Sequence, residues 1–267
     1  MSAPRIVRTW EWALPPEPVR REVVSALPVD DEGKPPVLFV PGFGHGAWVF
    51  AEHWLEQTAS RGFPAYAMSL RGHGGSGSTR RAGLRAYTHD VTQVAASLPR
   101  QAVLVGHGAS ALVVARALAR YPARAAVLVS PVPGGFRTAL TALARNPIGT
   151  LPALVGGRLR LRRGQLFSRE LPTSVARGYS ARLGRASTRA QWQLLFGRAP
   201  EPPVGDPPVL VVGSPDDRVV PRSALTRVSR RYGRAPLLFP GVGHDMMLDA
   251  RWREPIDAIL DWVDKPV

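Results

Sequence analysis

Short runs of apolar residues alternate with longer amphipathic segments along most of the chain. The apolar runs end in turn-forming residues, which is typical of buried strands in a parallel sheet. They are VLFV, PAYAMSL, AVLVG, AAVLVS, PPVLVVG and APLLF. The amphipathic segments are expected to be helices at residues 48–60, 87–98, 109–121, 222–231 and 253–263. This alternation predicts an α/β fold with a mainly parallel central sheet and helices on both faces.

Two parts of the chain depart from this alternation. Near the N-terminus, residues 5–12 and 19–26 are expected to form two short strands separated by LPPEP. Residues 133–206 contain helix-like pieces and no convincing strand. We therefore expect a core domain made of residues 1–132 and 207–267, interrupted by a helical lid at 133–206.

The composition excludes several classes of protein. The 267 residues include no cysteine, so disulfides, thiolate metal sites and a cysteine nucleophile are ruled out. No apolar stretch approaches the roughly 20 residues that a membrane-spanning helix needs, and the N-terminus does not resemble a signal peptide, so a cytoplasmic protein is expected. The histidine spacing suggests no metal site, and Rossmann and P-loop patterns are missing, so no cofactor is expected.

The formal charge of +15 comes almost entirely from arginine. No nucleic-acid-binding motif or aromatic-interleaved basic repeat accompanies it, so nucleic acid is not an expected partner. Within residues 134–200 there are twelve arginines against one acid, Glu170. Two interpretations stay open: a solvated surface in an arginine-rich protein, or a basic lid over an anionic small-molecule substrate, such as a carboxylate or a carrier-linked acyl group.

Glycine-rich turns follow the predicted strands in an informative order. They are VLFVPGFGHGAW, LRGHGGS, VLVGHGAS, VLVVGSPDDRVVP and FPGVGHDMMLD. Together they resemble the α/β-hydrolase superfamily over essentially the whole chain. The resemblance implies, in chain order, an oxyanion loop, a strand-to-helix elbow that carries a nucleophile, an acid loop and a histidine loop.

The resemblance also implies roles for individual residues. His244 is the expected catalytic base, and Asp217 is its expected carboxylate partner because DRVVP matches the family pattern. Counting forward from Gly213 selects Asp216 instead, so this alternative stays open. The backbone amides of Phe43 and Ala109 would form the oxyanion hole. The pocket is expected to include three further side chains, those of His45, His107 and Asp216.

The elbow lacks the residue that the family uses for chemistry. Its motif reads Gly-His-Gly-Ala-Ser, with Gly108 in the place of the nucleophilic serine. Ser110 lies two residues beyond the apex, in the first turn of the expected helix, where it should pack or cap rather than attack. The backbone conformation at an elbow apex costs a non-glycine residue about 1–3 kcal/mol, whereas glycine adopts it with little penalty.

Three hypotheses about function follow. The chain is an enzyme that acts on a carbonyl or acyl compound through the His244–Asp217 dyad and the oxyanion hole, without an acyl-serine intermediate. Alternatively, it is a non-catalytic protein that uses the pocket to bind a ligand. In the third hypothesis it is an ordinary serine esterase or lipase inactivated at position 108.

Overall fold

The computed structural model describes residues 14–79, 82–154, 159–197 and 199–265. Its centre is a seven-stranded sheet in the order β1-β3-β2-β4-β5-β6-β7. The first strand runs antiparallel to β3, and every other neighbouring pair is parallel. The strands are β1 (Val23–Ala26), β2 (Val37–Val40), β3 (Ala65–Met68), β4 (Val103–His107), β5 (Ala125–Val129), β6 (Val209–Gly213) and β7 (Leu237–Leu238).

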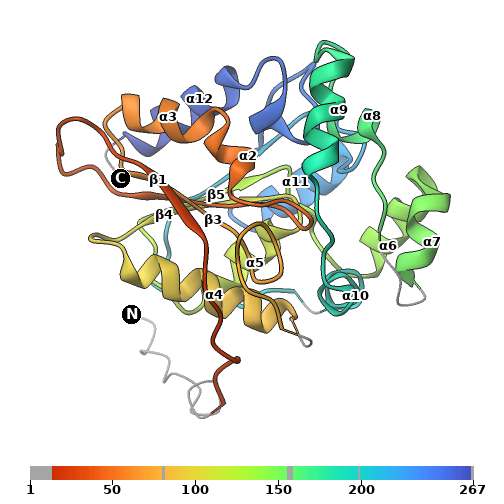
Figure 1. The fold of residues 1–267 in the computed structure, drawn as a ribbon, viewed down its shortest axis with the longest axis horizontal. Helices are drawn as coiled ribbons and strands as arrows, with labels where there is room; N and C mark the ends of the chain where they lie inside the picture. The colour runs from red at the N-terminus through yellow and green to blue at the C-terminus, as the bar shows by residue number, and fades with distance from the viewer. Residues whose placement is uncertain (1–13, 80–81, 155–158, 198, 266–267) are drawn as a thin grey trace.

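Helices cover both faces of this sheet (Figure 1). The core elements are α2 (Trp48–Ala51), α3 (Trp54–Ser60), α4 (Leu84–Ser97), α5 (Ser110–Ala117), α11 (Arg222–Arg230), the 3₁₀ helix η1 (Met246–Leu248) and α12 (Arg253–Val263). Side chains of β2 alternate between two apolar clusters. Val37 and Phe39 pack with α3 and α12, whereas Leu38 and Val40 pack with α4 and α5. The predicted α/β fold with a mainly parallel sheet is confirmed.

The insertion between β5 and β6 contains helices and, in its described part, no strand. Its helices are α6 (Phe136–Arg145), α7 (Pro147–Leu154), α8 (Arg163–Leu166), α9 (Thr173–Arg182) and α10 (Thr188–Phe196). Figure 1 shows them gathered at one side of the sheet. Three of them follow the helix-like pieces of the sequence. Helix α7 was not predicted, because it contains prolines at 147 and 152 and proline usually marks a helix boundary.

Several predicted boundaries were wrong. The single helix expected at 48–60 is divided into α2 and α3, because His53 has a non-helical backbone. The imidazole of His53 stacks on Trp252 at 4.6 Å, and the Trp54 indole donates to the Trp252 carbonyl. These contacts hold the break between α2 and α3 against a segment 198 residues further along the chain.

Other elements are present with different lengths. Helix α5 ends four residues earlier than the expected 109–121, and α4 begins three residues before residue 87. Only residues 23–26 of the strand expected at 19–26 pair with the sheet. The strand expected at 5–12 lies outside the described residues. Among the described helices, none is both long enough and apolar enough to cross a bilayer.

Candidate active site

The elbow lies at the carboxyl end of β4, where the chain turns sharply into α5. At its apex Gly108 has a φ of +56°, a conformation that favours glycine over other residues. Its N–H donates to the Val129 carbonyl at 2.9 Å, and its carbonyl accepts from the Val132 N–H at 3.0 Å. The apex is therefore held between β4 and the end of β5, although it carries no side chain.

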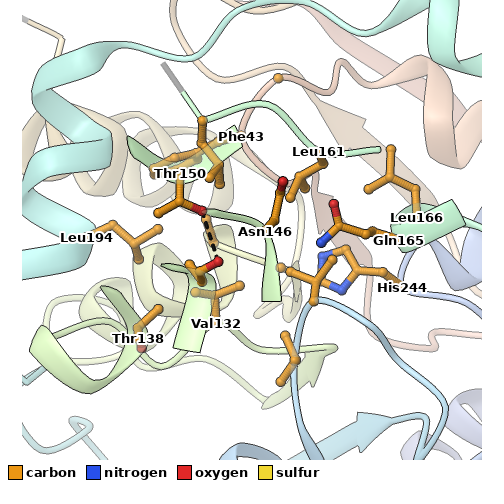
Figure 2. Close-up of a pocket in the computed structure, with 18 of the residues that line it drawn as sticks. Phe43, Val132, Thr138, Asn146, Thr150, Leu161, Gln165, Leu166, Leu194 and His244 are labelled. Carbon is orange, nitrogen blue, oxygen red and sulfur yellow. Dashed lines mark hydrogen bonds between the residues drawn. The ribbon is translucent and has the colours of Figure 1, made fainter. Parts of the chain in front are cut away.

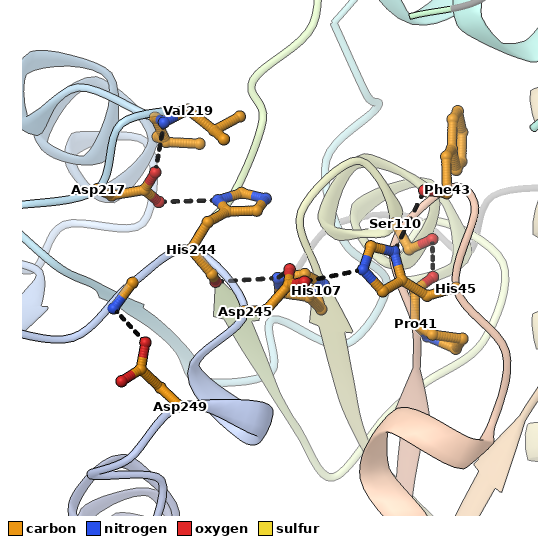
Figure 3. A network of polar contacts seen from close by, with 12 residues as sticks. Pro41, Phe43, His45, His107, Ser110, Asp217, Val219, His244, Asp245 and Asp249 are labelled. Atoms are coloured by element: carbon orange, nitrogen blue, oxygen red, sulfur yellow. Dashed lines mark hydrogen bonds and ion pairs between the residues drawn. The ribbon is translucent and has the colours of Figure 1, made fainter. Parts of the chain in front are cut away.

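Ser110 does not replace the missing nucleophile. Its side chain is completely buried, and its hydroxyl donates to the Pro41 carbonyl at 2.6 Å. The serine does not cap α5. Instead it joins the start of that helix to the loop after β2, which carries Phe43 (Figure 3). The hydroxyl is thus a structural link between the elbow and the expected oxyanion loop.

A carboxylate contacts the imidazole of His244. The Nδ1 atom of His244 lies 2.8 Å from Oδ2 of Asp217, and both residues are buried (Figure 3). The other carboxylate oxygen accepts hydrogen bonds from the N–H groups of Val219 at 2.7 Å and Val220 at 2.9 Å. These three contacts fix the carboxylate, which in turn fixes the orientation of the imidazole ring.

Electrostatics near His244 favour its protonated form. Burial alone would lower the pKa of His244, but the charge and hydrogen bond of Asp217, together with the charge of Asp245, raise it above the ordinary value. A neighbouring carboxylate that stabilises imidazolium helps a histidine to accept a proton during a reaction.

Asp216 occupies a different position. Its side chain is exposed, and its Oδ2 accepts a hydrogen bond from the Gly241 N–H at 2.7 Å. The side chain contacts neither His244 nor the cavity described below. The expectation that Asp216 is part of the pocket was therefore wrong, because its carboxylate is directed toward the turn at residue 241.

The second nitrogen of His244 faces the elbow. A Cβ placed on Gly108 would lie 3.3 Å from His244 Nε2, and both residues line the same cavity. Phe43 and Ala109 line it too. Among the described residues, no acceptor is hydrogen-bonded to the N–H of either Phe43 or Ala109. Two residues with unpaired amide groups, an imidazole and a glycine therefore line one cavity.

A second polar cluster lies directly behind these residues. His45 Nε2 is 3.1 Å from Asp245 Oδ2, and His45 Nδ1 is 3.2 Å from the Phe43 carbonyl. His107 Nε2 donates to the His244 carbonyl at 3.1 Å. His45 and His107 both line the cavity. The cluster joins the loop of Phe43 to the loop of His244 (Figure 3).

Asp245 is a member of this cluster that the sequence did not single out. Burial alone would raise the pKa of its carboxyl, but His45 above all, with His107 and His244, lowers it to about 2. The pKa of His107 falls to about 3, because complete burial and the neighbouring His244 disfavour its charged form. The only available signal for Asp245 was its place directly after His244, whereas its partner His45 lies 200 residues away.

One group of side chains has the composition of a metal site. His107, His244 and Asp245 are buried and each offers a ligand atom within 4.8 Å of the others; the described residues contain no other such group. However, His107 Nε2 already donates to a carbonyl, and His244 Nδ1 is bound to Asp217. The second nitrogen of each ring, His107 Nδ1 and His244 Nε2, has no hydrogen-bond partner among the described residues, so each ring keeps one nitrogen that could bind a metal ion.

The cavity in front of the dyad has a volume of about 640 Å³, within the range of small-molecule sites. Residues of α6, α7, α8 and α10 complete its wall, among them Thr138, Thr150, Leu166 and Leu194 (Figure 2). The insertion is fastened to the core beside the site: Gly184 N–H donates to the Gly44 carbonyl at 2.7 Å. The insertion thus encloses the space next to His244.

Comparison with solved structures shows the same fold in several hydrolases. A monoglyceride lipase of Saccharomyces cerevisiae has a TM-score of 0.74 at 12% identity, covering 93% of this chain and 92% of that one. A monoacylglycerol lipase of Paleococcus ferrophilus has a TM-score of 0.68 at 20% identity, covering 92% and 98%. An esterase of Rhodococcus sp. ECU1013 has a TM-score of 0.64 at 21% identity, covering 91% and 94%.

A search of curated proteins found no match to the chain. The model of the alpha/beta hydrolase family matches residues 37–260, which include the elbow, the insertion, the acid loop and the histidine loop. This match covers most of the chain and agrees with the fold. The chain belongs to the alpha/beta hydrolase family.

Proposed function

We propose that this protein is an enzyme that hydrolyses a carbonyl or acyl compound by direct attack of water, without an acyl-serine intermediate. The observation that carries the proposal is the position of His244 Nε2. Its partner nitrogen is fixed by Asp217 at 2.8 Å, and Nε2 faces the space that a side chain at position 108 would fill. A water molecule in that space would lie next to a histidine oriented for proton transfer.

The reaction follows from these positions. His244 Nε2 takes a proton from water while the water oxygen forms a bond to the carbonyl carbon. The π electrons of the carbonyl move to its oxygen, and the free N–H groups of Phe43 and Ala109 stabilise that oxyanion. When the tetrahedral intermediate collapses, the bond to the leaving group breaks, and the leaving group takes the proton from His244.

The rate enhancement expected from these groups is that of a modest enzyme. A positioned general base contributes about 10²–10⁴-fold, and one oxyanion donor about 10²–10³-fold. Without a covalent nucleophile, ordinary esters of poor leaving groups would react slowly. We therefore expect substrates with an activated acyl group, such as thioesters or esters of acidic alcohols.

The first test measures hydrolysis of a panel of 4-nitrophenyl esters and acyl thioesters. Wild-type protein should release product, and His244→Ala should lose about 10²–10⁴-fold of the rate. Gly108→Ala is the matched control for the water position, because its Cβ would occupy the space beside Nε2 without adding a nucleophile. We expect it to lower the rate as well. Equal rates in wild type and His244→Ala would refute the mechanism.

A fluorophosphonate probe, which labels activated serines, tests the geometry separately. Wild-type protein should remain unlabelled, whereas Gly108→Ser should be labelled at position 108 and lose the labelling when combined with His244→Ala. An unlabelled Gly108→Ser variant that is folded would show that the elbow does not face His244. This experiment does not depend on knowledge of the substrate.

Gly108 itself favours a second candidate, a ligand-binding protein without catalysis. That function predicts saturable binding in the cavity and no product over long incubation. It also predicts that His244→Ala changes no measurable turnover, because there is none. Product formation by the wild type that His244→Ala abolishes excludes this candidate.

A further inference from the structure

The charges on the cavity wall all have one sign. Among the described residues that line the cavity there are seven arginines and neither aspartate nor glutamate. We call this group the arginine rim, because every member is exposed. Its members are Arg137, Arg145, Arg160, Arg163, Arg185, Arg218 and Arg227.

The rim has free hydrogen-bond donors. Within the described part of the chain, no rim arginine forms an ion pair with an acid. Only two of them donate a guanidinium hydrogen bond to a described residue: Arg145 donates to the Asp217 carbonyl at 3.0 Å, and Arg218 donates to the Gly164 carbonyl at 3.1 Å. A guanidinium carries several N–H donors in a planar fork, so most donors of the rim stay available to a ligand.

Hydrogen bonds that involve four rim arginines or their neighbours in sequence lie on one side of the cavity, where the insertion contacts the acid loop. The bond from Arg145 reaches the backbone of Asp217, and the bond from Arg218 reaches the residue after Arg163. Asn146 Nδ2 donates to the Arg160 carbonyl at 2.6 Å, which brings the backbone of Arg160 beside the residue that follows Arg145. This side of the rim therefore lies next to the carboxylate that holds His244.

The inner wall has a different character. Figure 2 shows Phe43, Val132, Leu161, Leu166 and Leu194 around the cavity. Two polar residues of this wall form hydrogen bonds within the protein. The Thr150 hydroxyl donates to the Ala142 carbonyl at 3.0 Å, and the Asn146 side chain donates to a backbone carbonyl. The cavity thus combines an apolar interior with a cationic mouth.

From this combination we infer that the substrate is an amphiphilic anion, with an apolar acyl body in the interior and a carboxylate or phosphate group at the arginine rim. The inference rests on the proposed function for the position of the reacting carbonyl beside His244. Arginine forks bind carboxylate and phosphate through charge-assisted hydrogen bonds. An uncompensated positive field at a cleft also raises the local concentration of anions.

The experiment measures binding by isothermal titration calorimetry, with octanoate, octyl phosphate, octan-1-ol and octylammonium as probes. Two double variants are compared with wild type. Arg160→Gln/Arg163→Gln removes two rim charges from side chains that bond to no described residue. Arg169→Gln/Arg177→Gln is the matched control, because both arginines are exposed residues of the insertion that do not line the cavity.

We expect the two anions to bind at least about tenfold more tightly than octan-1-ol, with an affinity that falls as salt rises. The rim variant should lose about tenfold for the anions and nothing for octan-1-ol, and the control variant should match wild type. Tighter binding of octanoate assigns a carboxylate group, and tighter binding of octyl phosphate assigns a phosphate group. Either result supports the inference.

Three results would overturn it: no binding of either anion, equal binding of anions and octan-1-ol, or equal losses in the rim and control variants. Because calorimetry reads binding without turnover, it separates this inference from the mechanism. If His244→Ala hydrolyses as fast as wild type while the rim preference holds, the mechanism fails and the anion site stands. If the preference is missing while His244→Ala is inactive, only the substrate class fails.

Discussion

The sheet and the insertion differ in how they use their side chains. Strands β2, β4, β5 and β6 are buried at every position. The loops at their carboxyl ends hold the elbow and Asp217. In the insertion, α6 buries only Ala139 and α9 only Ala176. The proposed catalytic geometry thus depends on tightly packed elements, whereas five of the seven arginines proposed to recognise anions are exposed residues of the insertion. Changes in the insertion should alter ligand preference while leaving the dyad intact.

The largest expected effect belongs to the packed region. Asp217→Asn keeps the shape of the side chain and an oxygen for the Val219 and Val220 amides, but it removes the charge beside His244. We expect hydrolysis to fall about 10²–10⁴-fold, because the imidazolium formed in the reaction loses its partner. Steady-state rates on the most reactive ester or thioester of the panel measure this loss.

The pH profile of the same variant shows whether Asp217 acts through His244. A general base must be neutral, so the wild-type rate should rise with pH through the raised pKa of His244. Without the charge of Asp217, burial lowers this pKa, and the rise should move to lower pH while the plateau falls. If the plateau falls but the rate rises at the same pH as in wild type, Asp217 has only a structural role.

A smaller effect is expected for the packing of the elbow. Gly106 lies in β4 against α5, and a Cβ there would lie 2.7 Å from Val114 Cγ2 and 2.9 Å from the Ser110 carbonyl oxygen. Gly106→Ala should therefore destabilise the protein by about 1–3 kcal/mol, as overpacking of a core does. Urea unfolding followed by circular dichroism measures the change. An unchanged midpoint would mean that β4 and α5 separate without cost.

The sequence-based predictions were more accurate for the packed sheet than for the exposed insertion. Apolar runs that end in glycine-rich turns predicted the sheet and the elbow, because burial on both faces leaves a strong local pattern. The pattern failed where distant contacts decide. His53 divides a helix because it stacks on Trp252, and the choice between Asp216 and Asp217 depends on which carboxylate reaches His244 and which reaches the Gly241 amide.

Residues whose partners lie far away in sequence were the hardest to predict. Asp245 pairs with His45 across 200 residues, and only its place directly after His244 marked it in the sequence. The arginine excess of the insertion was visible in the sequence. Which arginines face the cavity was not, because some of them, such as Arg160 and Arg185, lie in loops where no helical period indicates their orientation.

The smallest expected effect lies in the insertion and has the opposite sign to that of Gly106→Ala. Gly178 lies inside α9, and a Cβ there would meet no atom within 4 Å. Because alanine favours a helix over glycine and restricts the unfolded chain, Gly178→Ala should stabilise the protein by about 0.5–1 kcal/mol. The same urea unfolding measures the gain, with hydrogen exchange of the α9 amides to locate it. If α9 opens independently of the sheet, its amides gain protection while the global midpoint stays fixed. A loss of stability as large as that of Gly106→Ala would show instead that α9 is packed like the core, and the contrast between the two regions would fail.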